Sequence, residues 1–409
     1  MLHSTSTRPQ LLRQLSLRQF GLSTASVALA VAPLFALAGS VALVTSPTAM
    51  AAAVVTPQAS KTDRIFSKNK KTAKVEAATG VVTEAGLGGI KFTERGDKAV
   101  NVDADRMVQI QWGDVPSSFT DGETYAKRGE WESAVSNFQT AAGDSDARDV
   151  VKAAARVRSI ESMMKWGATD PARFTDAVAE SDRFMSDHSE NWQVPAVRAL
   201  KARASWLSGD AAGARDGYKA LFDAGKSGTE GYTALATAEA ALEGARAALS
   251  STETSTAREL FDSSASAFGA IDSNDPAVMA RAKAGAEVAR MAAAESQLAK
   301  GDFAGAARAF ESAMESAETS AGKGAAKLGL GRALVGKGDT VEAQVHLGWV
   351  AGLDHTSADR RAAALVALGE ALMGSSDGAG VAKAALQRVK AEYGATPSAA
   401  KATELLSGL

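Results

Sequence analysis

The sequence predicts a mainly α-helical protein, an α-solenoid of about seven stacked helix pairs preceded by a small antiparallel β-barrel. Its 409 residues are rich in Ala and include only 9 Pro and 6 Trp, which is typical of helices that contact one another through small residues. A ten-residue pattern that begins with Gly recurs from residue 129 onward. Short β-type runs separated by turn residues precede this pattern, and they predict the barrel.

The N-terminal segment predicts export from the cytoplasm. The first 60 residues contain no Asp or Glu, and Arg8, Arg13 and Arg18 precede an apolar run over residues 25–44. Small residues follow at 49–51, so a signal peptide over residues 1–51 is expected. A run of about 20 apolar residues can also span a bilayer, which leaves an uncleaved N-terminal membrane anchor as the alternative. Either reading predicts an exported, periplasmic or cell-envelope protein.

Residues 52–62 are predicted to be a linker, and residues 63–115 a small β-barrel. Five β-type runs, among them "GVVTE", "GIKFT" and "MVQIQW", are separated by the turn-forming stretches "ATG", "GLG" and "RGD". This pattern resembles the Sm-like and SH3-like barrels that precede helical repeats in some exported bacterial proteins. A barrel of about 50 residues is marginally stable alone, so we expect it to pack on the helices that follow.

The recurring pattern begins at Gly129 ("GEWESAVSNF"), Gly209 ("GDAAGARDGY"), Gly301 ("GDFAGAARAF") and Gly338 ("GDTVEAQVHL"). A Gly can end one helix in the left-handed conformation, and an acid next to it suits the N-terminus of a second helix. The Ala at the sixth place allows the two helices to cross closely. The large residue at the tenth place fills the space between one pair and the next.

The spacing of these glycines predicts further pairs between them. Successive glycines are 80, 92 and 37 residues apart, so each of the two longer gaps fits two units. The hidden units are expected at residues 166–184 and 251–268. A seventh unit ends the series and consists of a helix with Gly369, a turn at "GSSDGAG" and a helix with "VAKAALQRV". The solenoid then covers residues 117–395. Residues 396–409 are predicted to form a capping helix that shields the last apolar face.

These helix pairs resemble the tetratricopeptide repeat (TPR) family in a degenerate form. Leu330, Gly331 and Leu334 occupy the first-helix positions that the family fills with its Leu-Gly-x-x-Tyr element, and Gly122 and Tyr125 do the same in the first unit. The family's Trp near the start of the first helix and its Pro at the end of the second are mostly missing. The resemblance implies a concave groove, lined by first-helix side chains, that holds peptides or partner proteins.

The groove positions of the recognisable units predict a set of partner-binding residues. A Trp or Met on a helix is also a common core residue, so a packing role stays open for each. The carboxylate clamp of the family's chaperone-tail binders, made of Lys and Asn, is not reproduced. The predicted partner-binding residues are Arg203, Trp206, Met291, Glu295, Leu328 and Arg332.

The sequence predicts no catalytic, cofactor or metal site. There is no Cys, and no pair among the four His has metal-ligand spacing. "GSSDG" at residues 374–378 fits the nucleophile elbow, but a helix rather than a strand precedes it and the last His is at position 355. "AGKS" at residues 224–227 lacks the earlier Gly of a phosphate loop, because Ala220 stands there. Both are interpreted as helix ends or turns.

No nucleic-acid partner is expected, since the net charge is only -2. "SKNKKTAK" at residues 67–74 carries four Lys, but residues 61–115 hold 10 basic and 8 acidic residues, a net charge of +2. This stretch is interpreted as a solvated hairpin, with contact to anionic lipid or polysaccharide as the alternative.

The sequence therefore predicts a non-enzymatic protein- or peptide-binding scaffold of the cell envelope, which acts through the concave face of the solenoid. The expected partner is an envelope protein or peptide, no cofactor is expected, and the N-terminal apolar segment is a candidate membrane tether. The alternative function is a structural spacer in an envelope assembly, with the barrel contacting membrane or wall polymer.

Overall fold

The computed structural model describes residues 62–94, 96–373 and 377–408. The predicted signal peptide or anchor, residues 1–51, lies outside the described residues, as does the linker up to residue 61. The described chain divides into two compact units, of which the first ends at His346 and the second begins at Leu347.

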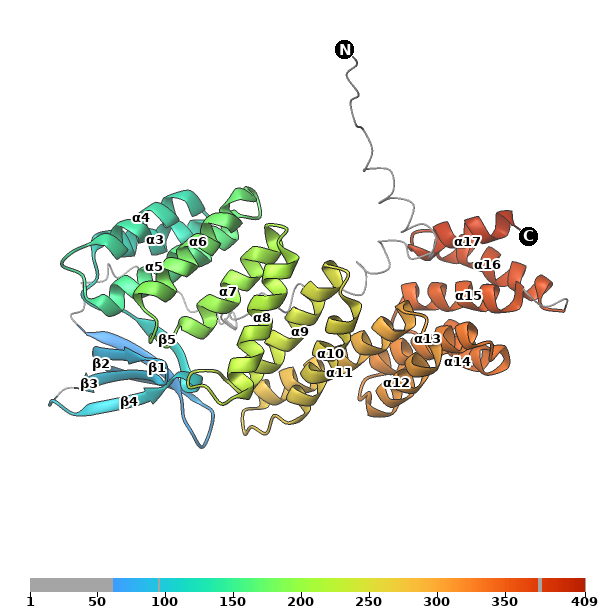
Figure 1. Cartoon of the computed structure of the whole chain (residues 1–409), viewed down its shortest axis with the longest axis horizontal. Coiled ribbons are helices and arrows are strands. Elements are labelled where there is room, and N and C mark those ends of the chain that lie inside the picture. Colours follow the sequence, from blue (N-terminus) through green and yellow to red (C-terminus); the bar gives the residue numbers. More distant parts are fainter. Residues whose placement is uncertain (1–61, 95, 374–376, 409) are drawn as a thin grey trace, which may run out of the picture. The chain divides into compact units, whose positions relative to one another are not determined.

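The first unit opens with five antiparallel strands, which confirms the predicted β-rich element. They are β1 (Asp63–Lys68), β2 (Val75–Gly86), β3 (Gly89–Glu94), β4 (Ala99–Asp103) and β5 (Met107–Gln111), with a short 3-10 helix, η1 (Ala104–Arg106), before β5. The order β4-β3-β2-β1-β5 brings the last strand beside the first. Strands β4 and β5 form the two edges of this sheet (Figure 1).

The sheet buries one face against the helices that follow it. Alternate residues of its strands, such as Ile65, Ile90 and Phe92, are at most 4% exposed, as the period of two in a strand requires. Trp112, after β5, and Trp192, which lies between two helices, pack against this core. The sheet therefore packs on the helical part of the unit, as expected for so small an element.

Fifteen helices follow in the described residues. They are α3 (Ser117–Arg128), α4 (Trp131–Gly143), α5 (Asp149–Trp166), α6 (Ala172–Asp187), α7 (Val194–Leu207), α8 (Ala211–Lys226), α9 (Ala234–Ser250), α10 (Thr254–Gly269), α11 (Pro276–Ala299), α12 (Phe303–Ser316), α13 (Ser320–Lys337), α14 (Thr340–Leu353), α15 (Ala358–Met373), α16 (Ala379–Glu392) and α17 (Ser398–Ser407). They form seven pairs and one final helix, so the mainly α solenoid of the predicted fold class is confirmed.

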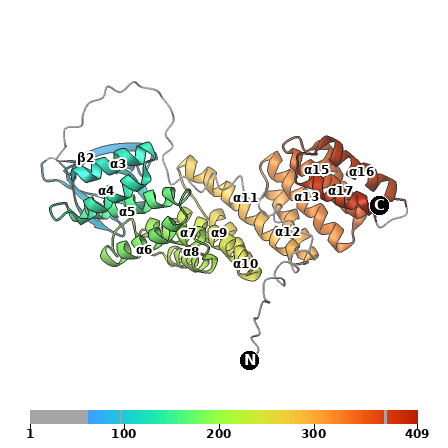
Figure 2. The same cartoon turned by 90° about the horizontal axis from the view of Figure 1, so that it is seen from above.

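Neighbouring helices pack on one another in chain order. From α3 to α13 each helix contacts the next, as Figures 1 and 2 show from two directions. The first helices of adjacent pairs also touch, α5 with α7, α9 with α11 and α11 with α13. In the second unit, α16 packs on α15, and α17 contacts both. First helices are therefore neighbours in two stretches of the first unit, α5 with α7 and α9 through α13.

The recurring Gly ends the first helix of its pair in the left-handed conformation. The φ angles are 76° at Gly129, 96° at Gly209, 78° at Gly301 and 93° at Gly338. The acid that follows caps the second helix in two pairs, since the carboxylates of Asp210 and Asp302 accept hydrogen bonds from backbone N–H groups three residues later, at 2.8 and 2.9 Å. The turn predicted from Gly and an acid is confirmed.

The small and large residues of the pattern lie where the helices meet. Ala306 and Ala343 are fully buried, and so are their equivalents in the other two clear pairs. The ring of Phe310 is also fully buried and lies against Gly329 on the next first helix. A Cβ atom on Gly329 would come within 2.2 Å of that ring, so the absence of a side chain there lets adjacent pairs approach.

The hidden pair of α9 and α10 follows the same pattern with one exchange. Thr252 takes the place of Gly and adopts a φ of 64°, in the left-handed region. Glu253 follows it, Ala257 stands at the sixth place and Phe261 at the tenth, and the last two are at most 1% exposed. The sequence located this unit but not its register, because a β-branched residue rarely occupies a left-handed turn.

Candidate interaction surface

Five first helices end at a left-handed residue, so the residue six positions earlier marks one equivalent place on each. These residues are all charged and half-buried, and they are called here the charged row. The charged row consists of Glu123 on α3, Arg203 on α7, Arg246 on α9, Glu295 on α11 and Arg332 on α13.

Four of the six predicted partner-binding residues lie together on α11 and α13. Met291 stands one turn before Glu295, and Leu328 stands one turn before Arg332, on helices that contact each other. The guanidinium of Arg332 forms an ion pair with the carboxylate of Glu295 at 3.4 Å, and the two side chains are 37% and 41% exposed. The charges at this place are therefore already paired within the chain.

The other two predicted residues lie on α7, away from this group. Arg203 and Trp206 are both half-buried. The indole of Trp206 packs against a core cluster that includes Tyr218, Leu221 and Phe222. Trp206 therefore has a packing role in addition to any contact with a partner, which is the alternative that the sequence left open.

Sequence reasoning missed the charged residues of α9, which stands between α7 and α11. Glu239, Glu243 and Arg246 follow one another at helical spacing on the part of α9 that is not fully buried. The carboxylate of Glu243 pairs with Arg246 at 2.5 Å, and that of Glu239 pairs with Arg281 of α11 at 2.5 Å. Burial raises the pKa of Glu239 above its ordinary value. The signal that could have revealed them is the Thr252-Glu253-Ala257-Phe261 pattern.

The surface thus combines half-exposed apolar side chains with internally paired charges. The structure places the six predicted residues on first helices, four of them adjacent and two on α7; their role in binding stays a prediction.

Within residues 62–94, 96–373 and 377–408, no group of three His, Asp or Glu side chains could hold a metal ion. "AGKS" at residues 224–227 forms the end of α8, as predicted, instead of a loop after a strand. Positions 374–376 of "GSSDG" lie outside the described residues, and the stretch connects helix α15 with helix α16.

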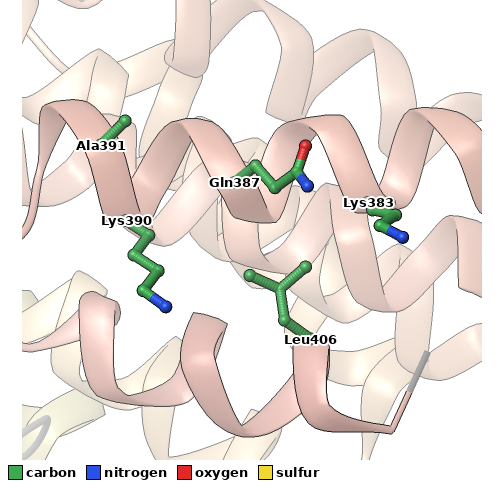
Figure 3. Close-up of a pocket in the computed structure, with 5 residues that line it drawn as sticks. All are labelled: Lys383, Gln387, Lys390, Ala391 and Leu406. Carbon is green, nitrogen blue, oxygen red and sulfur yellow. The ribbon is translucent and has the colours of Figure 1, made fainter.

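The second unit carries a shallow hollow between α16 and α17, shown in Figure 3. Lys383, Gln387, Lys390 and Ala391 line it from α16, and Leu406 lines it from α17. It is open to solvent, and both lysines are exposed. The hollow therefore offers no enclosed site for a small molecule.

Among the described residues, no helix is both long and apolar enough to cross a bilayer. The apolar run at residues 25–44, which carries the anchor prediction, lies outside them.

No protein-family model matches this sequence, and no curated protein matches it. Solved structures match by fold. The apo form of RapI has a TM-score of 0.52 at 9% identity, covering 70% of this chain and 79% of that one. The C-terminal part of a TPR repeat-containing protein from Cytophaga hutchinsonii scores 0.47 at 13% identity, with 70% and 99% covered. A tetratricopeptide repeat protein from Parabacteroides merdae scores 0.39 at 14% identity, with 71% and 96% covered. The match with RapI shows a shared helical fold, and the stacked helix pairs of this chain are TPR-like in their arrangement.

Proposed function

We propose that this protein is a non-enzymatic scaffold of the cell envelope that binds protein or peptide segments on the surface formed by its first helices. The observation that carries the proposal is the contact between successive first helices, which places half-buried apolar and charged side chains along one surface. Surfaces of this kind, built by stacked helix pairs, suit extended or helical peptide segments. We further interpret the N-terminal sheet as a partly open barrel of the SH3-like kind.

The ion pair between Glu295 and Arg332 determines how a partner could bind to either charged side chain. A partner that binds Arg332 through a carboxylate must replace Glu295 in the pair at 3.4 Å. Removing the competing carboxylate by Glu295→Ala would then strengthen binding, whereas Arg332→Ala would weaken it. A partner that instead pairs with Glu295 reverses both effects. The two single variants therefore report the charge of the partner segment.

The test compares partner recovery after cross-linking in envelope fractions. The double variant Trp206→Ala, Arg332→Ala should stay folded and lose its partners, since anchors of this kind typically carry about 2 kcal/mol or more, roughly a thirtyfold change in affinity. Arg308→Ala is the matched control, because Arg308 is an exposed residue of the second helix α12. Unchanged recovery with retained helical circular dichroism would exclude Trp206 and Arg332 as anchors.

Failure of every first-helix variant to alter recovery would favour the second candidate function, a structural spacer. The sheet contacts several helices of the first unit, which would suit a rigid spacer. In that role the sheet contacts membrane or wall polymer, and the isolated protein binds no soluble partner.

The proposed location outside the cytoplasm rests on residues 1–51. Protease added to spheroplasts should digest the chain, and N-terminal sequencing should find a mature protein that begins near Ala52. An intact longer chain that sediments with membranes would indicate the anchor. Protection from the protease in spheroplasts would contradict both forms of the proposal.

A further inference from the structure

Contacts between the N-terminal sheet and the helices gather at the beginnings of four successive first helices, α5, α7, α9 and α11. The sheet is not simply the first module of a linear array, because its contacts reach residues up to 207 positions away in the chain. Three groups of contacts can be distinguished along this series.

The first group joins the sheet to the beginning of α5. Asp63, fully buried at the start of β1, accepts hydrogen bonds from both terminal nitrogens of Arg148 at 2.9 and 2.7 Å. Its carboxylate also accepts from the backbone N–H groups of Val82 and Gly113, each at 2.8 Å. Arg148 is the residue before α5, and its hydrogen bond to Asp63 raises its pKa above the ordinary value. This group ties β1 and β2 to α5.

The second group lies between the β2–β3 turn and the loops that precede α7 and α9. Leu87 of the turn packs into the core cluster of α5, α6 and α7, and Trp192, just before α7, packs into the sheet core. Gly88 lies so close to Glu230 that a Cβ atom on it would come within 1.9 Å of that carboxylate. A Cβ atom on Gly231, before α9, would lie 2.5 Å from the carbonyl oxygen of Leu87.

The third group joins the β1–β2 hairpin to the beginning of α11. The ammonium of Lys68 pairs with the carboxylate of Asp275, which also caps α11 through the backbone N–H of Ala277 at 2.9 Å. The side-chain amide of Asn274 donates to the carbonyl oxygens of Lys70 and Lys71 at 3.3 and 3.2 Å. Two side chains, Lys68 from the hairpin and Asn274 from the residues before α11, thus join the hairpin to α11, and they are called here the latch.

In a helical solenoid each pair contacts only its neighbours, so curvature is the sum of small rotations from pair to pair. A separate body attached to the first and last members of a series removes that freedom. We propose that the N-terminal sheet is a brace that fixes the curvature of the second to fifth helix pairs, with the Lys68 and Asn274 latch as its far attachment. The brace would fix the curvature independently of what the surface of the first helices binds.

The test measures the distance between two helices across the braced series. The chain has no Cys, so spin labels can be placed at two introduced cysteines only. Ala179→Cys on α6 and Ser312→Cys on α12 are exposed positions of the second and fifth pairs. We expect a narrow distance distribution in the otherwise unchanged protein. In the latch variant Lys68→Ala, Asn274→Ala the mean distance should shift, and the width of the distribution should increase by several ångström.

Lys71→Ala is the matched control, because it removes a Lys from the same hairpin while leaving the latch side chains in place. It should reproduce the narrow distribution. A second label pair, Ala179→Cys with Ala220→Cys on α8, spans one step of the series and should change less than the long pair.

Identical long-distance distributions in the latch variant and in Lys71→Ala would overturn the proposal, since neighbour packing alone would then set the curvature. Should the latch variant lose helical circular dichroism, the double variant Asp275→Asn, Asn274→Ser provides the decisive measurement. An Asn at position 275 can still cap α11, while the ion pair to Lys68 and the side-chain amide that bonds Lys70 and Lys71 are both lost. Broadening in this folded double variant supports the brace, and an unchanged distribution excludes it.

Discussion

The helix pairs and the N-terminal sheet are stabilised by contacts of different range. Within the pairs and between adjacent pairs, the recurring Gly, Ala and aromatic residues join helices that are neighbours in the chain, as Phe310 of α12 and Gly329 of α13 do. The contacts that hold the sheet to the helices join residues far apart in the chain. Asp63 and Arg148 are separated by 85 positions, and Lys68 and Asp275 by 207 positions. The contacts between neighbouring helices appear in the sequence as a repeated residue pattern, whereas each contact between the sheet and the helices involves residues that occur in no repeat. The stability of the two regions should therefore respond to different kinds of substitution.

The largest effect is expected where the sheet meets α5. Asp63→Ala would leave the guanidinium of Arg148 and two backbone N–H groups without their buried acceptor. Breaking a buried ion pair by removing one partner costs about 3–5 kcal/mol. Urea unfolding and hydrogen exchange of the Val82 and Gly113 amides measure the loss.

Asp149→Ala is the control for this substitution. Its carboxylate is 94% exposed and pairs with Lys152 at 3.6 Å, so its loss should cost about 1 kcal/mol or less. Equal destabilisation by the two variants would show that the buried ion pair of Asp63 and Arg148 contributes no more to the free energy of unfolding than an exposed ion pair does.

The next effect concerns the helix crossings. Ala306 is fully buried, so Ala306→Leu should overpack the crossing of α11 and α12 and cost about 1–3 kcal/mol. Ala304→Leu, on the exposed side of α12, should change stability by about 0.5 kcal/mol or less. An unchanged thermal midpoint for Ala306→Leu would contradict the packing role of the sixth-place Ala.

A smaller and pH-dependent effect is expected at the latch. The hydrogen bond from Lys68 holds the pKa of Asp275 below its ordinary value. A lowered pKa in the folded state stabilises the fold at pH values above the unfolded pKa, about 3.9, and this stabilisation is lost as the pH falls through the folded pKa. Asp275→Asn should therefore destabilise by about 1 kcal/mol or less at pH 7.

The difference between Asp275→Asn and the unchanged protein should shrink when unfolding is followed below pH 4 or so, as the native carboxylate becomes protonated. A difference that stays constant from pH 7 to the acid range would show that the charge of Asp275 makes no contribution through Lys68.

The smallest effect tests the register of the hidden pair, and it is stabilising. Thr252→Gly removes a β-branched side chain from a left-handed position, where non-Gly residues are disfavoured by about 1–2 kcal/mol. Part of this gain in stability is offset because Gly increases the conformational entropy of the unfolded chain. A net gain of about 0.5–1 kcal/mol is expected in urea unfolding. Ser255→Gly, in the first turn of α10, should destabilise instead. Destabilisation by Thr252→Gly would refute this account of the turn.

The candidate surface was predictable only in part. The positions of Glu295 and Arg332 follow from counting back from Gly301 and Gly338, because the turn sets the register of the preceding helix. Their pairing with each other depends on the side-chain geometry between two helices, which spacing in the sequence does not specify. The charged residues of α9 were missed because Thr252 replaces the Gly from which the count would start.

The sequence by itself determined the elements whose signals are local. The Gly and acid of the turn, the small residue at the crossing and the alternating strands each act within about one helix pair or one strand, so their patterns predict the mainly α solenoid and the five-stranded sheet. Only the tertiary structure decided where the sheet is attached. Asp63 with Arg148, and Lys68 with Asp275, have no repeated spacing, and their energy arises from burial and proximity created by the folded helices. Contacts of this kind are specified by the completed packing, because the partners meet only after the helices between them have stacked.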